Sequence, residues 1–218
     1  GTNVIEVSYD RLGRKTDLKD PNLGWLHYDI NPLGQIWAQT NPIQRSKGIK
    51  TWMEYDSSGR LIARYEGDLE SHWVYDISAM GKGSLSEAYT GSEKEKDYRR
   101  LVKYDSNGRP KSTTQVISGM NYVNSYRYDL WGRVAGYSLQ RGNSGAISFG
   151  YNYNNMGYFS RLTRGNLVIK EVVEQDAANN PVTVYLNAAA SKQSSEYWEQ
   201  TGRLRSITVS KGGGITLA

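Results

Sequence analysis

Four copies of one six-residue pattern, Tyr-Asp-x-x-Gly-Arg, constrain this sequence more than any other feature. They begin at Tyr9, Tyr55, Tyr104 and Tyr128. Asp is favoured at the first position of a type I turn, and Gly supplies the left-handed residue that follows such a turn. Together they close a short hairpin with a bulge. Each copy therefore predicts a hairpin tip, with Tyr ending one strand and Arg starting the next.

Weaker copies extend the series along the chain. Two of them lengthen the turn, two replace Tyr-Asp by Tyr-Asn or Trp-Glu, and one has Asn179 at the glycine position. Asn is the next best residue for left-handed backbone, so that exchange is physically coherent. The predicted motif residues are Tyr9, Asp10, Gly13, Arg14, Tyr28, Asp29, Gly34, Tyr55, Asp56, Gly59, Arg60, Tyr75, Asp76, Gly81, Tyr104, Asp105, Gly108, Arg109, Tyr128, Asp129, Gly132, Arg133, Tyr153, Gly157, Trp198, Gly202 and Arg203.

The turn residues recur with a period typical of a repeat protein. They fall at positions 13, 34, 59, 81, 108, 132, 157, 179 and 202, separated by 21 to 27 residues. Such a period accommodates two strands and two turns. Residues before the tips alternate between apolar and polar, as Ile5, Val7 and Tyr9 do, which indicates strands with one buried face. We therefore predict an all-β repeat architecture: about nine hairpins in one curled, spiralling antiparallel sheet over residues 1–218.

Composition supports strands over helices. The chain has 17 Tyr and 6 Trp but only 2 Phe and 4 Met, and it has 23 Gly. Amphipathic aromatics suit strands, and a chain with many tight turns uses glycine. The stretch Ala188-Ala189-Ala190 has helical leanings, but it is too short for a stable helix by itself. The one charge run, Glu93 to Asp97, is interpreted as a solvated return loop.

The same numbers weigh against several functional classes. The net charge of +5 is spread along the chain, which favours solubility over nucleic-acid binding. With 0 Cys there is no disulfide or thiolate metal site. No apolar run is long enough for a membrane helix. The residues from Lys211 to Gly214 lack the flanking Gly and Ser/Thr of a phosphate-binding loop.

The repeated carboxylates and the two histidines are the candidates for chemistry. The fixed place of each Asp before a turn favours hydrogen bonding to the turn backbone over acid–base catalysis. His27 and His72 each lie on a strand that leads into a Tyr-Asp pair, with no sign of convergence on a triad or a zinc site. The motif arginines are expected to stack on tyrosines or to pair with a neighbouring unit's Asp. We expect no enzymatic activity and no cofactor or metal.

Aromatic side chains leave a binding function open. Trp25, Trp37, Trp52, Trp73 and Trp131 are the candidate glycan-stacking residues. Packing between strands accounts for most aromatics as well. The alternative hypothesis is therefore a cell-surface adhesion module that binds glycans through exposed Tyr and Trp.

The motif and its period resemble the RHS or YD-repeat family, from Tyr9 to about Val209. That family includes bacterial RHS proteins, the B and C components of insecticidal toxin complexes, wall-associated proteins and, more distantly, the shell of teneurins. The resemblance implies a β-ribbon that spirals into a hollow shell and, in bacterial members, encloses a toxin polypeptide. It also implies a bacterial protein that is secreted, at the cell surface or associated with a toxin complex.

The chain is expected to be a fragment of a larger shell. The first residues, Gly1 to Val4, resemble neither a signal peptide nor a natural start. The autoproteolytic Asp-Pro-x-Gly segment of full-length shells has no match between Ile207 and Ala218. A ring of this many strands would also be too narrow to hold a folded domain. The expected partners are the remainder of the parent shell, an enclosed toxin polypeptide and, through bare sheet edges, other copies of the chain.

Overall fold

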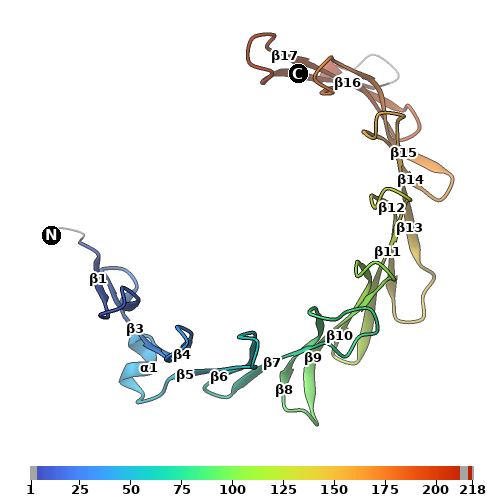
Figure 1. Cartoon of the computed structure of the whole chain (residues 1–218). Helices are drawn as coiled ribbons and strands as arrows, with labels where there is room; N and C mark the ends of the chain where they lie inside the picture. Colours follow the sequence, from blue (N-terminus) through green and yellow to red (C-terminus); the bar gives the residue numbers. More distant parts are fainter. Residues whose placement is uncertain (1–3, 212–215, 218) are drawn as a thin grey trace. The chain divides into compact units, whose positions relative to one another are not determined.

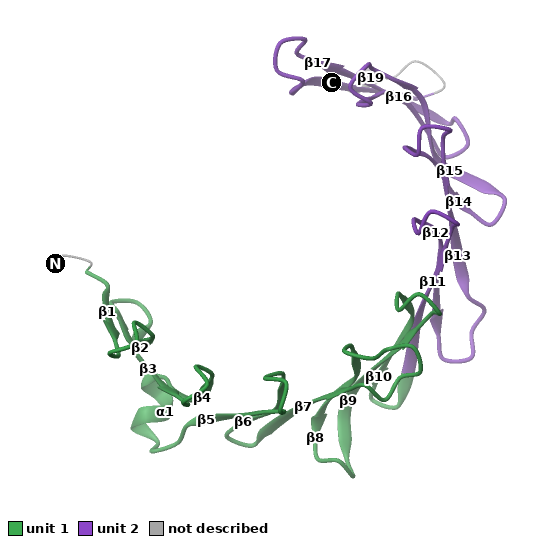
Figure 2. Cartoon of the chain, viewed as in Figure 1, with its two compact units in different colours: residues 1–120 green, residues 121–218 purple. Residues whose placement is uncertain are grey.

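The computed structural model describes residues 4–211 and 216–217 of the chain. These residues form two compact units, 1–120 and 121–218 (Figure 2). Predictions for Gly1 to Asn3, and for the glycines between Lys211 and Ile215, lie outside the described residues.

The first unit contains five hairpins and one short helix (Figure 1). Its elements are β1 (Glu6–Tyr9), β2 (Lys15–Asp20), β3 (Gly24–Ile30), β4 (Ile36–Thr40), α1 (Pro42–Ser46), β5 (Thr51–Tyr55), β6 (Leu61–Glu66), β7 (Leu69–Tyr75), β8 (Leu85–Gly91), β9 (Lys96–Tyr104) and β10 (Pro110–Ile117). Each strand pairs antiparallel with the next one, from β1 to β10.

The second unit continues the hairpin pattern. Its strands are β11 (Met120–Tyr128), β12 (Val134–Arg141), β13 (Ile147–Tyr153), β14 (Phe159–Arg164), β15 (Leu167–Gln175), β16 (Pro181–Leu186), β17 (Ser191–Tyr197), β18 (Leu204–Lys211) and β19 (Thr216–Leu217). Consecutive strands again pair antiparallel. Nine hairpins are therefore present in the described residues, and the predicted all-β repeat architecture is confirmed.

Every hairpin has an irregularity in its ladder of paired residues beside the tip. The ladder shifts register just inside each tip, as between Glu54 and Tyr55 in β5 and between Arg127 and Tyr128 in β11. A bulge of this kind adds one residue to the outgoing strand and increases its local twist and bend. Each unit, taken by itself, is accordingly a curved ribbon one strand-layer thick (Figure 2).

Few apolar side chains are fully buried, because a single layer has no second layer to cover it. The buried hydrophobic residues in the described part of the chain are Ala38, Ala63, Tyr89, Val102 and Val184. Stability in such a ribbon depends on contacts between neighbouring strands, which are the unit of sheet stabilisation.

The helix α1 was not predicted from the sequence. Asn41 caps it: its side chain accepts a hydrogen bond from the Gln44 amide, and the Gln44 side chain accepts one from the Asn41 amide. Pro42 in the first turn has the fixed φ that a helix start requires. This Asn-Pro-x-Gln capping signal was present in the sequence.

Of two other non-repeat segments, the alanine stretch forms no helix, as its short length predicts, and the charge run is only partly a loop. Ala188 and Ala189 have left-handed φ values of 54° and 68° and form a tight turn without helical character. At the end of the charge run, Lys96 begins β9 and pairs at 2.8 Å with Glu87, whose side chain is only 7% exposed. Only the first part of that run, Glu93 to Glu95, is an exposed loop.

A glycine substitution tests the turn geometry. Gly108 has a φ of 74°, where an added side chain is strained even with open space around it. We expect Gly108→Val to destabilise the protein by at least about 1–2 kcal/mol, the cost of left-handed backbone for L-residues, in a denaturant titration. Gly145→Ala is the matched control, because its Cβ would meet nothing within 4 Å and its φ is not positive. Equal midpoints for Gly108→Val and the parent chain would contradict the assigned turn.

Candidate functional site

The hairpin tips, each running from the Asp position to the Arg position, are the most regular feature of the chain. In the first tip, Asp10 Oδ1 accepts hydrogen bonds from the amides of Leu12 and Arg14 at 2.9 and 3.0 Å. Its Oδ2 accepts one from Arg14 Nε at 2.6 Å. The Gly13 amide donates to the Asp10 carbonyl, and Gly13 has a φ of 76°. One carboxylate thus fixes both the turn backbone and the arginine.

The same arrangement recurs at the other full motif copies. Asp56, Asp105 and Asp129 each accept two amide hydrogen bonds from their own tip and one from the tip arginine. The degenerate tips keep the amide contacts with other side chains. Asn154 Oδ1 accepts from the Met156 and Tyr158 amides, and Asp176 holds the Asn180 amide and side chain.

The predicted frame of the second tip was wrong. The turn is closed by Asn31, whose Oδ1 accepts from the Gln35 amide at 3.0 Å, and not by Asp29. Asn31 provides the same acceptor oxygen as Asp, so the tip has the normal length. Asp29 lies inside β3 and pairs instead with Lys50 at 2.8 Å.

The predicted turn glycine of the fourth tip was also wrong. Met80 and Gly83 have positive φ values of 62° and 80°, whereas Gly81 does not. A Cβ on Gly81 would lie 2.6 Å from the Tyr104 ring, so this glycine is required for close approach. Asp76 still organises the loop, because its Oδ1 accepts a hydrogen bond from the Gly83 amide.

The ninth tip is shifted by one residue from the predicted frame. β17 ends at Tyr197, and the Trp198 amide donates to the Arg203 carbonyl, as an Asp amide does in the other tips. Tyr197 therefore occupies the Tyr position and Trp198 the Asp position. The loop contains one residue more than the other tips. Placing Trp198 at the Tyr position gave the tip its normal length, so the sequence analysis missed the extra residue.

Contacts between neighbouring tips form a joint from one hairpin to the next. The hydroxyl of Tyr55 donates to the carbonyl of Ile36, the first residue after the preceding tip, at 2.7 Å. Tyr104, Tyr153 and Tyr197 make the equivalent bond to Leu85, Val134 and Pro181. In these four hairpins the repeated tyrosine, called the tyrosine hook below, is thus tied by its hydroxyl to the hairpin before it.

The tip arginines contact the following hairpin, whereas the tyrosines contact the preceding one. The Arg60 guanidinium lies 4.4 Å from the ring centroid of Tyr75 and pairs with Asp76 at 2.6 Å. Arg133 lies 4.1 Å from the Tyr153 centroid, and Arg14 donates to the Asn31 carbonyl. Both predicted roles, stacking on tyrosine and pairing with a neighbouring Asp, occur.

The tip carboxylates have lowered pKa values. Hydrogen bonding from the Arg14 amide lowers the pKa of Asp10, and the Arg60 amide does so for Asp56. The Arg109 side chain lowers the pKa of Asp105. At Asp129, burial acts to raise the pKa, but the hydrogen bonds from Arg133 outweigh it and the pKa is lowered. All these groups are ionised at neutral pH.

The candidate glycan tryptophans of the first unit have different surroundings. Trp37 and Trp52 are together, with ring centroids 5.1 Å apart and exposed fractions of 42% and 41%. Trp25 donates to Asp17 and lies 3.5 Å beneath Arg45, and Trp131, in the second unit, lies 4.9 Å from Arg133. Trp73 is half-buried in β7. Among the five candidate tryptophans, Trp37 and Trp52 are the pair with adjacent rings in the described residues.

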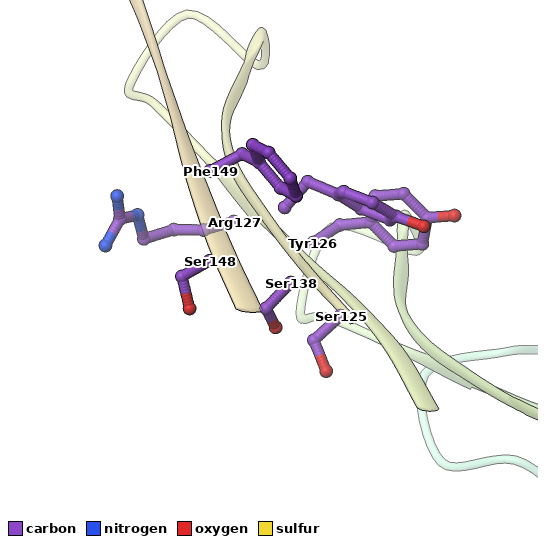
Figure 3. A pocket seen from close by; sticks show the side chains of 8 residues that line it. Ser125, Tyr126, Arg127, Ser138, Ser148 and Phe149 are labelled. Carbon is purple, nitrogen blue, oxygen red and sulfur yellow. The ribbon is translucent and has the colours of Figure 1, made fainter. Parts of the chain in front are cut away.

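In the second unit the two faces of the sheet carry different side chains (Figure 3). Ser125, Ser138 and Ser148 are cross-strand partners on β11, β12 and β13. Tyr126, Tyr137 and Phe149 alternate with them and form an aromatic row on the other face. These residues surround a depression of about 160 Å³, too small for most ligands.

The histidines are engaged in local contacts. His27 Nδ1 lies 2.8 Å from Asp17 Oδ1, and His72 stacks on Tyr89 with centroids 4.8 Å apart. The described residues contain no group of three or more His, Asp or Glu that could hold a metal ion. Among the same residues, no helix is long and apolar enough to span a membrane.

Solved structures similar to this chain come from bacterial toxin complexes. The Tc holotoxin pore of Photorhabdus luminescens matches with a TM-score of 0.61 and 12% identity, over 97% of this chain and 13% of the solved chain. The chain has the RHS/YD-repeat fold. The crystal structure of TcdB2-TccC3 matches with a TM-score of 0.60 and 12% identity, over 95% of this chain and 13% of the other. The structure titled TcdB2-TccC3-Cdc42 gives 0.59 and 12%, over 94% and 12%.

These matches confirm the resemblance proposed from the motif at the level of the fold. This chain spans about an eighth of the length of the solved RHS-repeat chains, since it covers 13% of the first of them. No protein-family model and no curated protein matches the sequence.

Removing one hydroxyl tests the tyrosine hook. Tyr55→Phe keeps the ring but loses the hydrogen bond to Ile36, and we expect a loss of about 1 kcal/mol in the free energy of unfolding. Tyr158→Phe is the matched control, because its hydroxyl has no hydrogen-bond partner among the described residues. Equal losses in the two variants would show that the hook contributes nothing specific.

The tip carboxylates predict acid sensitivity. Because their pKa values are lowered in the folded state, their contribution is complete above the unfolded pKa of about 4 and is lost as the pH falls through the folded value. We expect the melting temperature to fall between about pH 5 and pH 3.

Asparagine variants separate geometry from charge. Asn31 shows that Asn closes a tip without ionising. A chain with Asn at the four positions 10, 56, 105 and 129 should therefore have a shallower decline in melting temperature below pH 5. Asp68→Asn is the control, since Asp68 makes no hydrogen bond or ion pair through its side chain in the described residues. The same acid slope in all three proteins would contradict the assignment.

Proposed function

We propose that this chain is a non-enzymatic structural segment of a bacterial YD-repeat shell, whose parent protein encloses or delivers a toxin polypeptide. The observation that carries the proposal is that one type of hairpin occurs nine times in the described residues, with side-chain contacts that join neighbouring hairpins within each unit. The Asp, Tyr and Arg side chains of the motif make their described hydrogen bonds and ion pairs to other residues of the ribbon. The role of the repeat is therefore to extend a wall. In the described residues, hollows between tips such as the one lined by Arg133 and Tyr153 bring together no group of three or more His, Asp or Glu that could hold a metal ion.

The thin core supports a scaffold role within something larger. Many large apolar side chains are exposed, and at the tips they include Leu130 at 98% and Met156 at 79%. Such residues are normal singly, but their regular placement along a ribbon suits burial against further layers of a shell. The similar toxin-complex chains are far longer than this one, which agrees with a segment of a larger wall. The remainder of the parent shell and the enclosed polypeptide are the proposed partners.

The test uses the natural full-length polypeptide that contains this segment. Cryo-electron microscopy should place residues 4–211 in the wall of a hollow shell, with density for a polypeptide inside. Limited proteolysis should leave that inner polypeptide intact until the shell is opened with denaturant. A parent without a cavity, or an inner polypeptide cleaved as fast in the intact shell as in the opened one, would contradict the proposal.

One observation favours a second function, glycan binding. Trp52 and Tyr65 line a pocket of about 390 Å³ together with Lys50, next to the Trp37 ring. Two exposed rings, those of Trp37 and Trp52, fit the stacking of a sugar, and an acidic group on that sugar would take the place of Asp29 beside Lys50. The proposed activity is an adhesion function at a cell surface.

A glycan array separates the two functions. Binding of acidic glycans that is lost in Trp52→Ala and kept in Trp73→Ala would support the second function, because Trp73 is in neither the ring pair nor the pocket. If the segment is only part of a shell wall, we expect it to bind none of the glycans on a broad array.

A further inference from the structure

Two hollows of similar size lie between neighbouring hairpin tips of the second unit. The first has a volume of about 570 Å³ and is lined by residues of the β11–β12 and β13–β14 tips, among them Trp131, Asn155 and Met156. The second also has a volume of about 570 Å³ and is lined by residues of the β15–β16 and β17–β18 tips, among them Trp198 and Glu199. Both hollows are therefore built from the repeat itself.

Each hollow contains an exposed tryptophan with an arginine over its ring. Trp131 is 78% exposed, and the Arg133 guanidinium lies 4.9 Å from its ring centroid. Trp198 is 50% exposed, and the Arg205 guanidinium lies 4.8 Å from its ring centroid. A guanidinium in this position lies against one face of the indole. The exposed remainder of the ring is a platform on which a flat ligand can stack.

The polar groups of the hollows fit an uncharged ligand that carries hydroxyl groups. Asp176, Glu196 and Glu199 line the second hollow, where an anionic ligand would meet three carboxylates. A cationic ligand would meet the arginine of each hollow. Asn155 and Glu199 are exposed, and neither side chain makes a hydrogen bond within the described residues. Both are therefore free to bind the hydroxyl groups of a ligand. A sugar provides such hydroxyl groups together with an apolar face that stacks on an indole.

The surroundings of the hollows do not fit a peptide that adds to the sheet as a strand. β12 pairs with β13 beside the first hollow, and β16 pairs with β17 beside the second. Neither place has the free strand edge that this mode of peptide binding requires. The two joints are four strands apart along one edge of the sheet, or about 20 Å at the usual spacing between strands. A linear ligand of repeated units can reach both hollows.

We propose that the tip edge of the second unit binds a linear, uncharged polysaccharide, with one sugar stacked on Trp131 and a later sugar of the same polymer stacked on Trp198. Asn155 and Glu199 bind the hydroxyl groups of these sugars. The site goes beyond the wall function, because it attaches the wall to a polysaccharide. It is also separate from the Trp52 pocket of the first unit, for which an acidic sugar is proposed.

Oligosaccharides of increasing length measure the spacing of the two platforms. Isothermal titration calorimetry of the purified chain would use linear, uncharged oligomers of glucose, of mannose and of N-acetylglucosamine, from the disaccharide upward. Short oligomers should bind weakly at each hollow. For the oligomers that bind, the dissociation constant should fall about 100-fold once the oligomer is long enough to reach both hollows, because the second contact is then intramolecular.

Tryptophan variants assign the binding to the two hollows. Trp131→Ala and Trp198→Ala should each remove the gain with length and raise the dissociation constant of the long oligomers about 100-fold. The double variant should bind no oligomer. Leu130→Ala is the matched control, because Leu130 is a 98% exposed apolar residue of the same tip that does not line the hollow. It should bind as the parent chain does. Circular dichroism checks that the variants fold.

Three outcomes would overturn the proposal. The first is the absence of binding to every oligomer, and the second is affinity that does not change with oligomer length. The third is an equal loss in Leu130→Ala and Trp131→Ala. A reduced, carboxymethylated protein is the polypeptide probe. If the two tryptophan variants lose binding of this unfolded chain while no oligosaccharide binds, the hollows hold a polypeptide and the proposal is wrong. None of these results decides the shell function, which is tested in the parent protein, or the acidic-sugar pocket, which is tested with Trp52→Ala.

Discussion

A single side chain at the Asp position of the hairpin tips, a carboxylate in the four full motif copies, is the constraint on which the rest of the structure depends. Its two oxygens hold two turn amides and the side chain of the tip arginine, as at Asp10. The turn thereby satisfies its own backbone groups without help from a core, which a single layer cannot supply. Because the arginine is held at its Nε, its remaining nitrogens are directed to the next hairpin, where Arg60 reaches Asp76 and Tyr75.

The joints convert a series of hairpins into a ribbon. In the joint between β12 and β13, the strand ladder occurs together with the Tyr153 hydroxyl on the Val134 carbonyl and the Arg133 guanidinium over the Tyr153 ring. In other joints the ladder is accompanied by one of these side-chain contacts, as at Tyr55 or at Arg60. Individually these contacts contribute little, about 1 kcal/mol for a hydrogen bond of this kind and about 0.5–1 kcal/mol for an exposed cation–π contact. Repetition makes them sufficient, because the stability of a repeat protein is close to a sum of unit and nearest-neighbour contributions. A bulge inside every tip bends the ribbon at regular intervals, and that curvature is what a shell wall requires.

The fold could be predicted from the sequence because the residues of the motif determine the hairpin turn through contacts within the turn itself. Asp, Gly and the fixed spacing determine the turn, and the number of copies determines the architecture. Prediction failed where another residue supplies the same atom. Asn31 provides the acceptor oxygen expected from Asp29, and Tyr197 occupies the Tyr position that the sequence analysis gave to Trp198. Gly81 was misread because glycine serves two purposes, left-handed backbone and close approach, and only the position of the Tyr104 ring distinguishes them.

The joints themselves connect residues far apart in sequence, such as Tyr55 and Ile36, and no local pattern specifies that hydroxyl contact. The helix α1 was the one element with a readable signal, the Asn41–Gln44 capping box, that was missed.

The central claim is that neighbouring hairpins are coupled through the tip arginine and the following tyrosine. A double-mutant cycle on Arg133 and Tyr153, whose guanidinium carbon and ring centroid are 4.1 Å apart, measures this coupling directly. Arg133→Met and Tyr153→Leu, singly and together, should give a coupling free energy of about 0.5–1.5 kcal/mol in denaturant titrations. Additive effects of the two substitutions, with no coupling beyond experimental error, would contradict the claim that the repeated motif joins one hairpin to the next.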